Sequence, residues 1–83
     1  MPTICMFYGI LIQMYNNNEH NPPHFHAIYG DYVGEFEIRT LDMLEGDMPT
    51  KAQGLIREWG QIYQDDLMEI WNSQQFKKLK PLE

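Results

Sequence analysis

Cysteine is nearly absent from this sequence. Cys5 is the only one among 83 residues, so no disulfide can form within one chain. A lone cysteine in an apolar segment predicts a buried, reduced thiol, which is typical of proteins in the reducing cytoplasm. Long hydrophobic runs are also missing: no segment approaches the ~20 apolar residues that span a bilayer, and the N-terminus lacks the basic residues of a signal peptide. We therefore expect a cytoplasmic protein that is not inserted in a membrane.

Positive charge is scarce. Six Lys and Arg residues stand against twelve Asp and Glu residues, which gives a formal net charge of −6 at pH 7. An acidic surface repels the phosphate backbone of nucleic acids unless basic side chains gather in one place. Only Lys77, Lys78 and Lys80 do so in the sequence. Direct nucleic-acid binding is therefore disfavoured, and the charge suits a basic protein partner.

The common catalytic signatures are missing too. The sequence contains no phosphate-binding loop of the Walker type, no CxxC pair and no HExxH motif. Internal repeats and low-complexity linkers are also absent. Hydrophobic residues nevertheless make up 43% of the chain, which is enough for one compact core. These features predict a single domain over residues 1–83, and they assign no reaction to it.

The first half of the chain has the composition of β-strands. Residues 4–15 are rich in β-branched and aromatic side chains with Gly9 near their middle, which indicates two strands or one bent strand. Residues 24–29 and 32–39 form a predicted hairpin, because Gly30 can adopt the positive φ that a two-residue loop requires.

The register of this hairpin sorts the side chains onto two faces, because side chains alternate along a strand. The face assigned to the core carries Phe25, Ala27, Tyr29, Tyr32, Phe36 and Ile38. The other face carries His24, His26, Glu35 and Glu37 together with Ile28 and Val33. In this register His26 lies opposite Glu35, and His24 lies opposite Glu37. A slip by one residue would bury the two carboxylates.

The second half of the chain has helical periodicity. Residues 40–46 suit either a short helical turn or another small strand, and residues 46–49 carry an Asp and a Pro typical of a helix start. Apolar residues then recur every three or four positions: Ala52, Leu55, Ile56, Trp59, Ile62, Tyr63, Leu67, Ile70 and Trp71. A continuous helix over residues 49–75 would be roughly 40 Å long, so it either bends near Gly60 or Gln64 or packs partly on a partner. The predicted fold class is α+β, with an antiparallel sheet of three to four strands packed against a long C-terminal helix.

All three histidines lie within seven residues, beside a Pro-Pro step. His24 and His26 point to the same side of a strand, a workable spacing for two ligands of zinc or another divalent metal. His20 and a carboxylate from Glu35 or Glu37 are candidates to complete the site. The same groups also suit metal-free general acid–base chemistry, in which a carboxylate orients a histidine. A third interpretation is that they are exposed cross-strand His–Glu pairs that only stabilise the sheet.

The apolar stripe of the helix supplies candidates for a partner interface, namely Trp59, Tyr63 and Trp71. Core packing is the default for such residues, but aromatic side chains are also enriched at the centres of protein interfaces. A stripe longer than the sheet would leave an apolar patch uncovered, and such patches mark partner surfaces. We therefore expect a homodimer or a complex with another protein.

Several motifs together resemble one bacterial protein family. They are Met1-Pro2-Thr3, Phe7-Tyr8-Gly9, His20-x-Pro22-Pro23-His24-Phe25-His26-Ala27, Tyr29-Gly30, Gly46 with Pro49, Glu58-Trp59, and residues 67–71. In these motifs the chain resembles the small uncharacterised family called domain of unknown function 4160. The resemblance implies no activity, but it implies a layout like that of toxin–antitoxin cassettes, and hence a small cytoplasmic protein with a protein partner. The chain departs from the family pattern at Tyr63-Gln64, where many members carry a histidine.

These observations lead to three functional hypotheses. The first is a protein-interaction component of a toxin–antitoxin-like or mobile-element cassette. The second is a small metal-dependent hydrolase or nuclease that uses the histidine cluster. The third is an acidic inhibitor that occupies the nucleic-acid groove of another protein.

Overall fold

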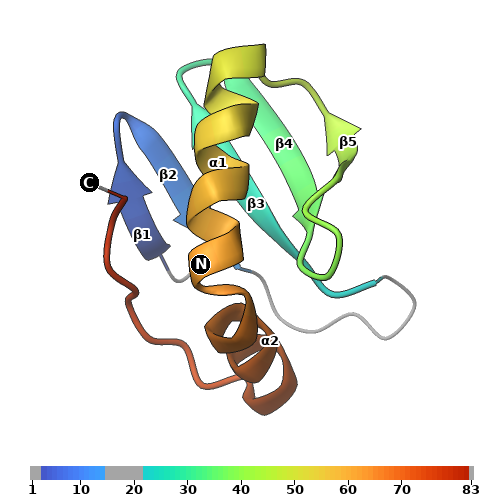
Figure 1. Ribbon diagram of the computed structural model, residues 1–83, viewed down its shortest axis with the longest axis vertical. Helices are drawn as coiled ribbons and strands as arrows, with labels where there is room; N and C mark the ends of the chain where they lie inside the picture. Colours follow the sequence, from blue (N-terminus) through green and yellow to red (C-terminus); the bar gives the residue numbers. More distant parts are fainter. Residues whose placement is uncertain (1–2, 15–21, 83) are drawn as a thin grey trace.

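The computed structural model describes residues 3–14 and 22–82. Within them the elements, in chain order, are β1 (Thr3–Phe7), β2 (Ile10–Gln13), β3 (His24–Tyr29), β4 (Tyr32–Glu37), β5 (Met43–Gly46), α1 (Thr50–Ile62) and α2 (Gln64–Ser73). The strands form one antiparallel sheet in the order β1-β2-β3-β4-β5 (Figure 1). The α+β class is therefore confirmed, but the described sheet has five strands where three to four were predicted.

The β3–β4 hairpin has the predicted register. Tyr29 pairs with Tyr32 across a two-residue loop, and Gly30 in that loop has a φ of 60°. His26 consequently lies opposite Glu35, as expected from the turn and the alternation of side chains. The expected break near Gly9 is also present, because a two-residue loop joins the paired ends of β1 and β2.

The fifth strand, β5, lies in residues 40–46, for which the sequence allowed either a helical turn or a small strand. The structure has the strand. Gly46 ends this strand with a φ of 99° and pairs with Gly34 of β4. A Cβ atom at Gly46 would lie 2.2 Å from the carbonyl oxygen of Val33. Only glycine therefore lets β5 approach β4 this closely, and such a tertiary requirement is not visible in the short sequence of the strand.

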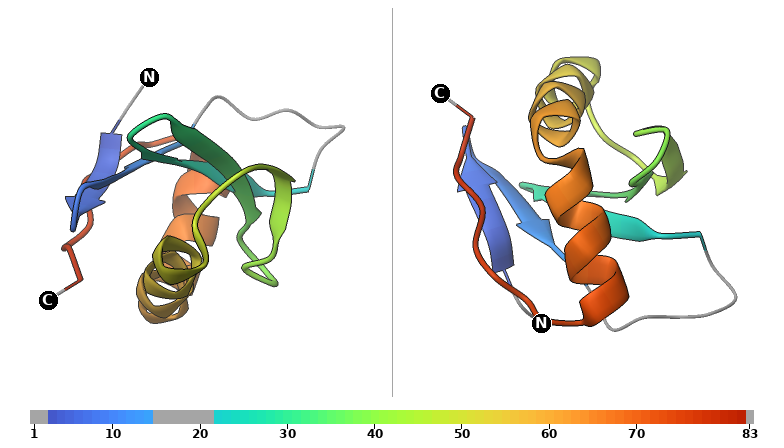
Figure 2. Two further views of the ribbon diagram at one scale, coloured as in Figure 1. Left: turned by 90° about the horizontal axis from the view of Figure 1, so that it is seen from above. Right: turned by 60° about the horizontal axis from the view of Figure 1, so that its bottom comes forward.

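The predicted long C-terminal helix is in fact two helices, with the break close to the expected bend at Gln64. Tyr63 lies between them with φ −111° and ψ 20°. The side-chain amide of Gln64 donates to the carbonyl oxygens of Ile38 at 2.8 Å and Arg39 at 2.7 Å. This anchor holds the break against the chain that follows β4, and α2 continues in a different direction from α1 (Figure 2).

Both helices lie on the same side of the sheet, and the core fills the space between them (Figure 2). Trp59 of α1 is fully buried there, with ring centroids 5.5 Å from Phe7 and 6.0 Å from Phe25. Cys5 is buried in the same core, and this burial raises the pKa of its thiol. The predicted buried thiol is therefore confirmed. No helix in the described residues has the length and apolar character needed to cross a membrane.

The chain after α2 returns along β1 (Figure 1). The backbone N–H of Leu79 donates to the carbonyl oxygen of Ile4 at 2.8 Å. The carbonyl oxygen of Lys80 accepts a 2.9 Å hydrogen bond from the indole Nε1 of Trp59. Phe76 and Leu82 pack against the core from the same segment. This segment therefore covers part of the outer edge of the sheet, which would otherwise present unpaired backbone groups.

The predicted core face of the hairpin needs one correction. Phe25, Ala27, Phe36 and Ile38 are buried as expected, whereas Tyr29 and Tyr32 are exposed. These two tyrosines flank the hairpin turn, and alternation along a strand does not reveal where the covering layer ends.

Candidate metal centre

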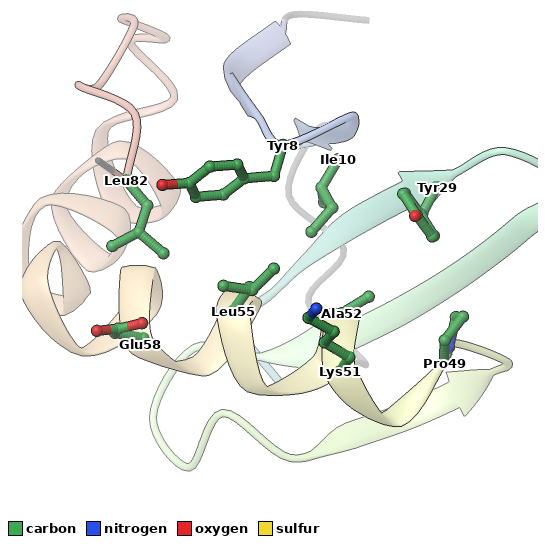
Figure 3. Close-up of a pocket in the computed structure, with 9 residues that line it drawn as sticks. All are labelled: Tyr8, Ile10, Tyr29, Pro49, Lys51, Ala52, Leu55, Glu58 and Leu82. Atoms are coloured by element: carbon green, nitrogen blue, oxygen red, sulfur yellow. The ribbon is translucent and has the colours of Figure 1, made fainter.

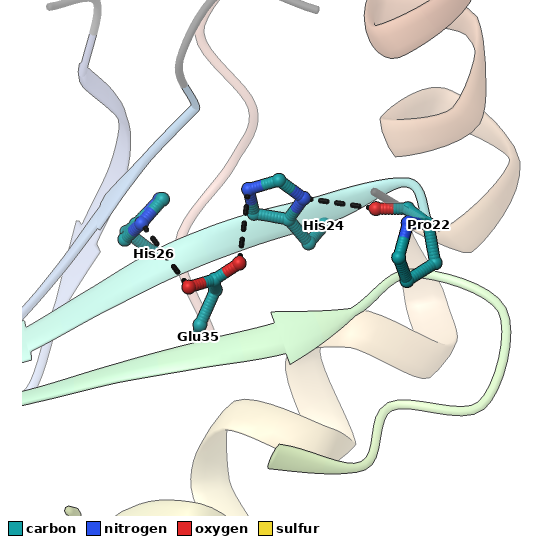
Figure 4. A network of polar contacts seen from close by, with 4 residues as sticks. All are labelled: Pro22, His24, His26 and Glu35. Atoms are coloured by element: carbon teal, nitrogen blue, oxygen red, sulfur yellow. Dashed lines mark hydrogen bonds and ion pairs between the residues drawn. The ribbon is translucent and has the colours of Figure 1, made fainter. Parts of the chain in front are cut away.

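Three of the predicted metal ligands come together on the face of the sheet that points away from α1. His24 and His26 project from β3 on the same side, and the register places Glu35 of β4 beside them. One ligand atom from each of these side chains lies within 4.8 Å of the other two (Figure 4). The distance from Nε2 of His24 to Oε1 of Glu35 is 3.2 Å, and Nε2 of His26 lies 3.9 Å from Oε2. Glu35 therefore bridges the two imidazoles.

His24 is oriented by the Pro-Pro step before it. Its Nδ1 lies 2.9 Å from the carbonyl oxygen of Pro22 (Figure 4). Because a carbonyl only accepts, Nδ1 must carry the proton, and a neutral ring then directs the Nε2 lone pair at Glu35. Histidines that bind metals are commonly oriented by such a bond from their other nitrogen. The sequence therefore pre-arranges His24 with its coordinating atom toward the cluster.

The contact between His24 and Glu35 requires a cation. A neutral imidazole lone pair and a carboxylate oxygen are both acceptors, so they repel each other at 3.2 Å. A proton on Nε2 removes this repulsion, and so does a metal ion bound by both atoms. Two ligand atoms bound to one tetrahedral zinc at about 2.0–2.1 Å lie about 3.3 Å apart. The observed distance matches this geometry, and a ring nitrogen of His26 lies within 4.8 Å of the other two ligand atoms.

His24 and His26 have different surroundings. His24 is only 6% exposed, and its ring centroid lies 5.1 Å from that of Trp71 on α2. The interpretation as an exposed surface pair is therefore wrong for His24. Burial lowers the pKa of His26, and the neighbouring His24 lowers it further, although Glu35 acts in the opposite direction. The neutral form of His26, which is the form that binds a metal, is thus favoured.

A shallow pocket of about 310 Å³ adjoins the cluster and is lined by His26, Val33, Glu35, Glu45 and Gly46. Glu45 lies directly opposite Glu35 in the β4–β5 register. Three protein ligands beside an open space resemble the arrangement of catalytic zinc sites, which keep one position for water or substrate. Glu45 was missed from the sequence because its segment was left open between a helical turn and a strand, so no strand partner could be assigned to it.

The other predicted site residues lie elsewhere. Glu37 is opposite His24 in the register, but the cluster in the described residues contains Glu35 instead. Residues diagonal to each other across two strands are still within reach of long side chains, and His24 uses this diagonal. His20 lies outside the described residues.

The three candidates for partner binding lie at the core. Trp59 and Trp71 are buried, and Tyr63 is half-buried with its ring 5.6 Å from that of Trp59. The two indoles are therefore not accessible from the surface in this structure, and the role of these residues toward a partner stays a prediction.

A larger pocket of about 490 Å³ lies between α1 and the end of the sheet that carries the β1–β2 turn (Figure 3). Among the described residues that line it, Lys51 and Glu58 of α1 are charged, and most of the others have apolar or aromatic side chains. Tyr8 and Leu82 come from opposite ends of the chain, so sequence spacing gave no sign of this pocket. Its described lining residues include no histidine or cysteine, and none of them belongs to the His–Glu cluster.

Comparison with known families identifies the chain. The family described as Domain of unknown function (DUF4160) matches residues 9–72. The chain belongs to the DUF4160 family. The matched segment includes His24, His26 and Glu35, whereas β1 and the chain after Asn72 lie outside it. Searches of curated proteins and of solved structures found no match. The family resemblance is thus confirmed, and the functional argument depends on the geometry of the site.

Proposed function

We propose that this DUF4160 protein binds one divalent metal ion, with zinc as the favoured candidate, through His24, His26 and Glu35. The observation that carries the proposal is the grouping of their ligand atoms within 4.8 Å. The hydrogen bond from His24 Nδ1 to Pro22 supports it, because this bond turns Nε2 toward the cluster. The lowered pKa of His26 also supports it, since a metal competes with a proton for the imidazole.

The chemistry that suits this centre is hydrolysis. Two imidazoles and one carboxylate leave at least one position open, and a bound metal lowers the pKa of water there to about 7. Glu35 and Glu45 both border the adjoining pocket. Their negative charge favours a neutral or cationic substrate over a polyanion, so hydrolysis of a substrate other than nucleic acid is favoured over nuclease activity.

The test is native mass spectrometry of the untagged protein, together with thermal unfolding in a zinc titration. We expect one zinc ion per chain and stabilisation of about 2.7 kcal/mol at free zinc 100 times the Kd. His24→Ala and Glu35→Gln should lose most of this stabilisation. Glu37→Gln is the matched control, because it removes a carboxylate two residues away on the same strand and should retain zinc.

Two results would contradict the metal centre. The first is a protein that stays metal-free and whose unfolding midpoint zinc leaves unchanged; the His24–Glu35 contact would then be a proton-mediated ion pair. The second is equal loss in Glu37→Gln and Glu35→Gln, which would show that zinc binds elsewhere. His20→Ala in the same titration measures whether the predicted third histidine contributes.

A second candidate function is protein interaction, as a component of a toxin–antitoxin-like or mobile-element cassette. The structural observation that favours the interaction is the exposure of Met6 (62%) and Val33 (50%), which lie on the sheet face that points away from α1. The hypothesis that this interaction belongs to such a cassette depends on the family resemblance alone. The narrower hypothesis of an acidic inhibitor depends on the net charge of −6. Binding of a helical peptide to this face tests the interaction.

A further inference from the structure

A continuous row of four apolar side chains crosses the open face of the sheet. Met6 of β1 pairs with Leu11 of β2, Leu11 pairs with Ile28 of β3, and Ile28 pairs with Val33 of β4. Directly paired residues of antiparallel strands project to the same face. The neighbouring row of Cys5, Ile12 and Ala27 is buried toward the helices, so the apolar row faces away from them.

This apolar row is accessible. Met6 and Val33 at its two ends are 62% and 50% exposed, and Leu11 and Ile28 between them are half-buried. α1 lies on the other side of the sheet (Figure 2), and α2 reaches this face at His24, whose ring lies against that of Trp71. Exposed apolar groups aligned across four strands are typical of a surface that a partner covers.

The dimensions of the row suit one helix. Neighbouring strands are about 4.8 Å apart, so a row across four strands is about 14 Å long. A helix with a 5.4 Å pitch covers this distance in about 2.7 turns, or ~10 residues. Apolar side chains at positions i, i+3, i+4 and i+7 of such a helix would lie along the row.

A second copy of the chain fits less well. A stable interface buries roughly 800 Å² on each partner, which four side chains, two of them half-buried, do not supply. Two chains would also each bring a net charge of −6 to the contact. The area argues against a stable dimer through this row alone, and the charge favours a partner of different sequence.

The charge around the row indicates the character of that partner. Asp31 is exposed two residues before Val33, and the acidic pair Glu35 and Glu45 lies in the next row of the same face. We propose that the open sheet face docks a basic amphipathic helix of another protein, with the apolar side chains of that helix on the Met6–Val33 row. This inference depends on the interaction function proposed above. It needs no metal, although Val33 and Glu35 also border the pocket beside the proposed metal centre.

A synthetic peptide tests the docking surface directly. The probe is a fluorescein-labelled 14-residue amphipathic helix, with Leu at the i, i+3, i+4 and i+7 positions and Lys on both flanks. We expect saturable binding in fluorescence anisotropy, and at least about tenfold weaker binding of a peptide with Glu in place of Lys.

Two matched variants locate the contact. Val33→Lys places a charge in the row and should weaken binding at least about tenfold. Ile62→Lys adds the same charge at a side chain that is 61% exposed on α1, on the other side of the sheet, and should leave the Kd within about twofold. Both positions are exposed, and unfolding midpoints confirm that both variants fold.

The inference is overturned if the peptide shows no saturation below about 1 mM, if the Glu peptide binds equally well, or if Val33→Lys and Ile62→Lys weaken binding equally. Co-purification with the product of the neighbouring gene tests separately whether the protein binds a partner at all and whether it binds through this surface. A complex that persists in Val33→Lys keeps the interaction function and rejects this surface. Loss of the complex in Val33→Lys but not in Ile62→Lys supports both.

Discussion

At the scale of single residues, one near neighbour in sequence and two distant ones determine how His24 is held. Pro22 directs the ring of His24, Trp71 covers it, and Glu35 lies at its Nε2. Burial is the largest influence on His26 and lowers its pKa, and Glu35 only partly offsets this effect. The folded protein therefore holds His26 as a neutral imidazole more strongly than the unfolded chain does.

This difference predicts a pH dependence of stability in the metal-free protein. Between the lowered pKa of His26 and its unfolded value of about 6.5, the unfolded chain binds more protons than the folded one. Stability is then complete above about pH 6.5 and decreases as the pH falls through this window. In the presence of a chelator, urea unfolding of His26→Gln should lose less stability between about pH 7.5 and pH 5 than the wild type does. An equal or larger loss in the variant would show that His26 is not responsible.

At the scale of elements, small local features determine where β5 and the helices lie. Gly46 allows β5 to pair with β4, because a Cβ there would collide with the carbonyl oxygen of Val33. Gln64 anchors the start of α2 to the carbonyl oxygens of Ile38 and Arg39. It occupies the region where related sequences are expected to carry a histidine, so a structural role accounts for its side chain here.

Two glycine substitutions test these local features, because they are expected to change the stability of the protein in opposite directions. Gly46→Ala should destabilise the protein by at least about 2 kcal/mol, because its φ is positive and its Cβ meets backbone. Gly54→Ala should stabilise it by about 0.5–1 kcal/mol, since Gly54 lies within α1 and its added Cβ meets no atom within 4 Å. Urea unfolding measures both changes, and a shift of the same sign in both variants would refute the explanation.

At the scale of the whole molecule, the two ends of the described chain hold each other in place. Leu79 binds β1 through the carbonyl oxygen of Ile4, and Lys80 accepts from the indole of Trp59. Both partners lie outside the segment 74–82, and β1 also lies outside the residues that the family shares. The C-terminal flanking segment thus contacts both the other flanking segment, at Ile4, and the family core of residues 9–72, at Trp59.

Truncation tests the contribution of the C-terminal segment. Deleting residues 76–83 removes three packed side chains, Phe76, Leu79 and Leu82, and leaves the indole N–H of Trp59 without its acceptor. We expect a loss of at least about 2 kcal/mol in unfolding free energy and a red shift of tryptophan fluorescence. Lys78→Ala is the control and should leave both measurements unchanged. A truncated protein with the wild-type midpoint would show that the segment is only an exposed extension.

The sequence by itself determined the features that depend on local chemistry. The Gly30 turn and the alternation of side chains predicted the β3–β4 register, and this register placed His26 opposite Glu35. Helical periodicity predicted the apolar stripe and a bend near Gln64, where α2 begins. Turns and periodicities are readable because residues within a few positions of each other produce them.

Only the tertiary structure decided how the candidate site closes. The cross-strand neighbour of His24 is Glu37, yet its ring meets Glu35 diagonally and is covered by Trp71. The fifth strand, the burial of the partner-binding candidates and the open apolar row were likewise decided there. These features depend on which face the helices cover and on how distant segments pack, and neither has a local signature in the sequence.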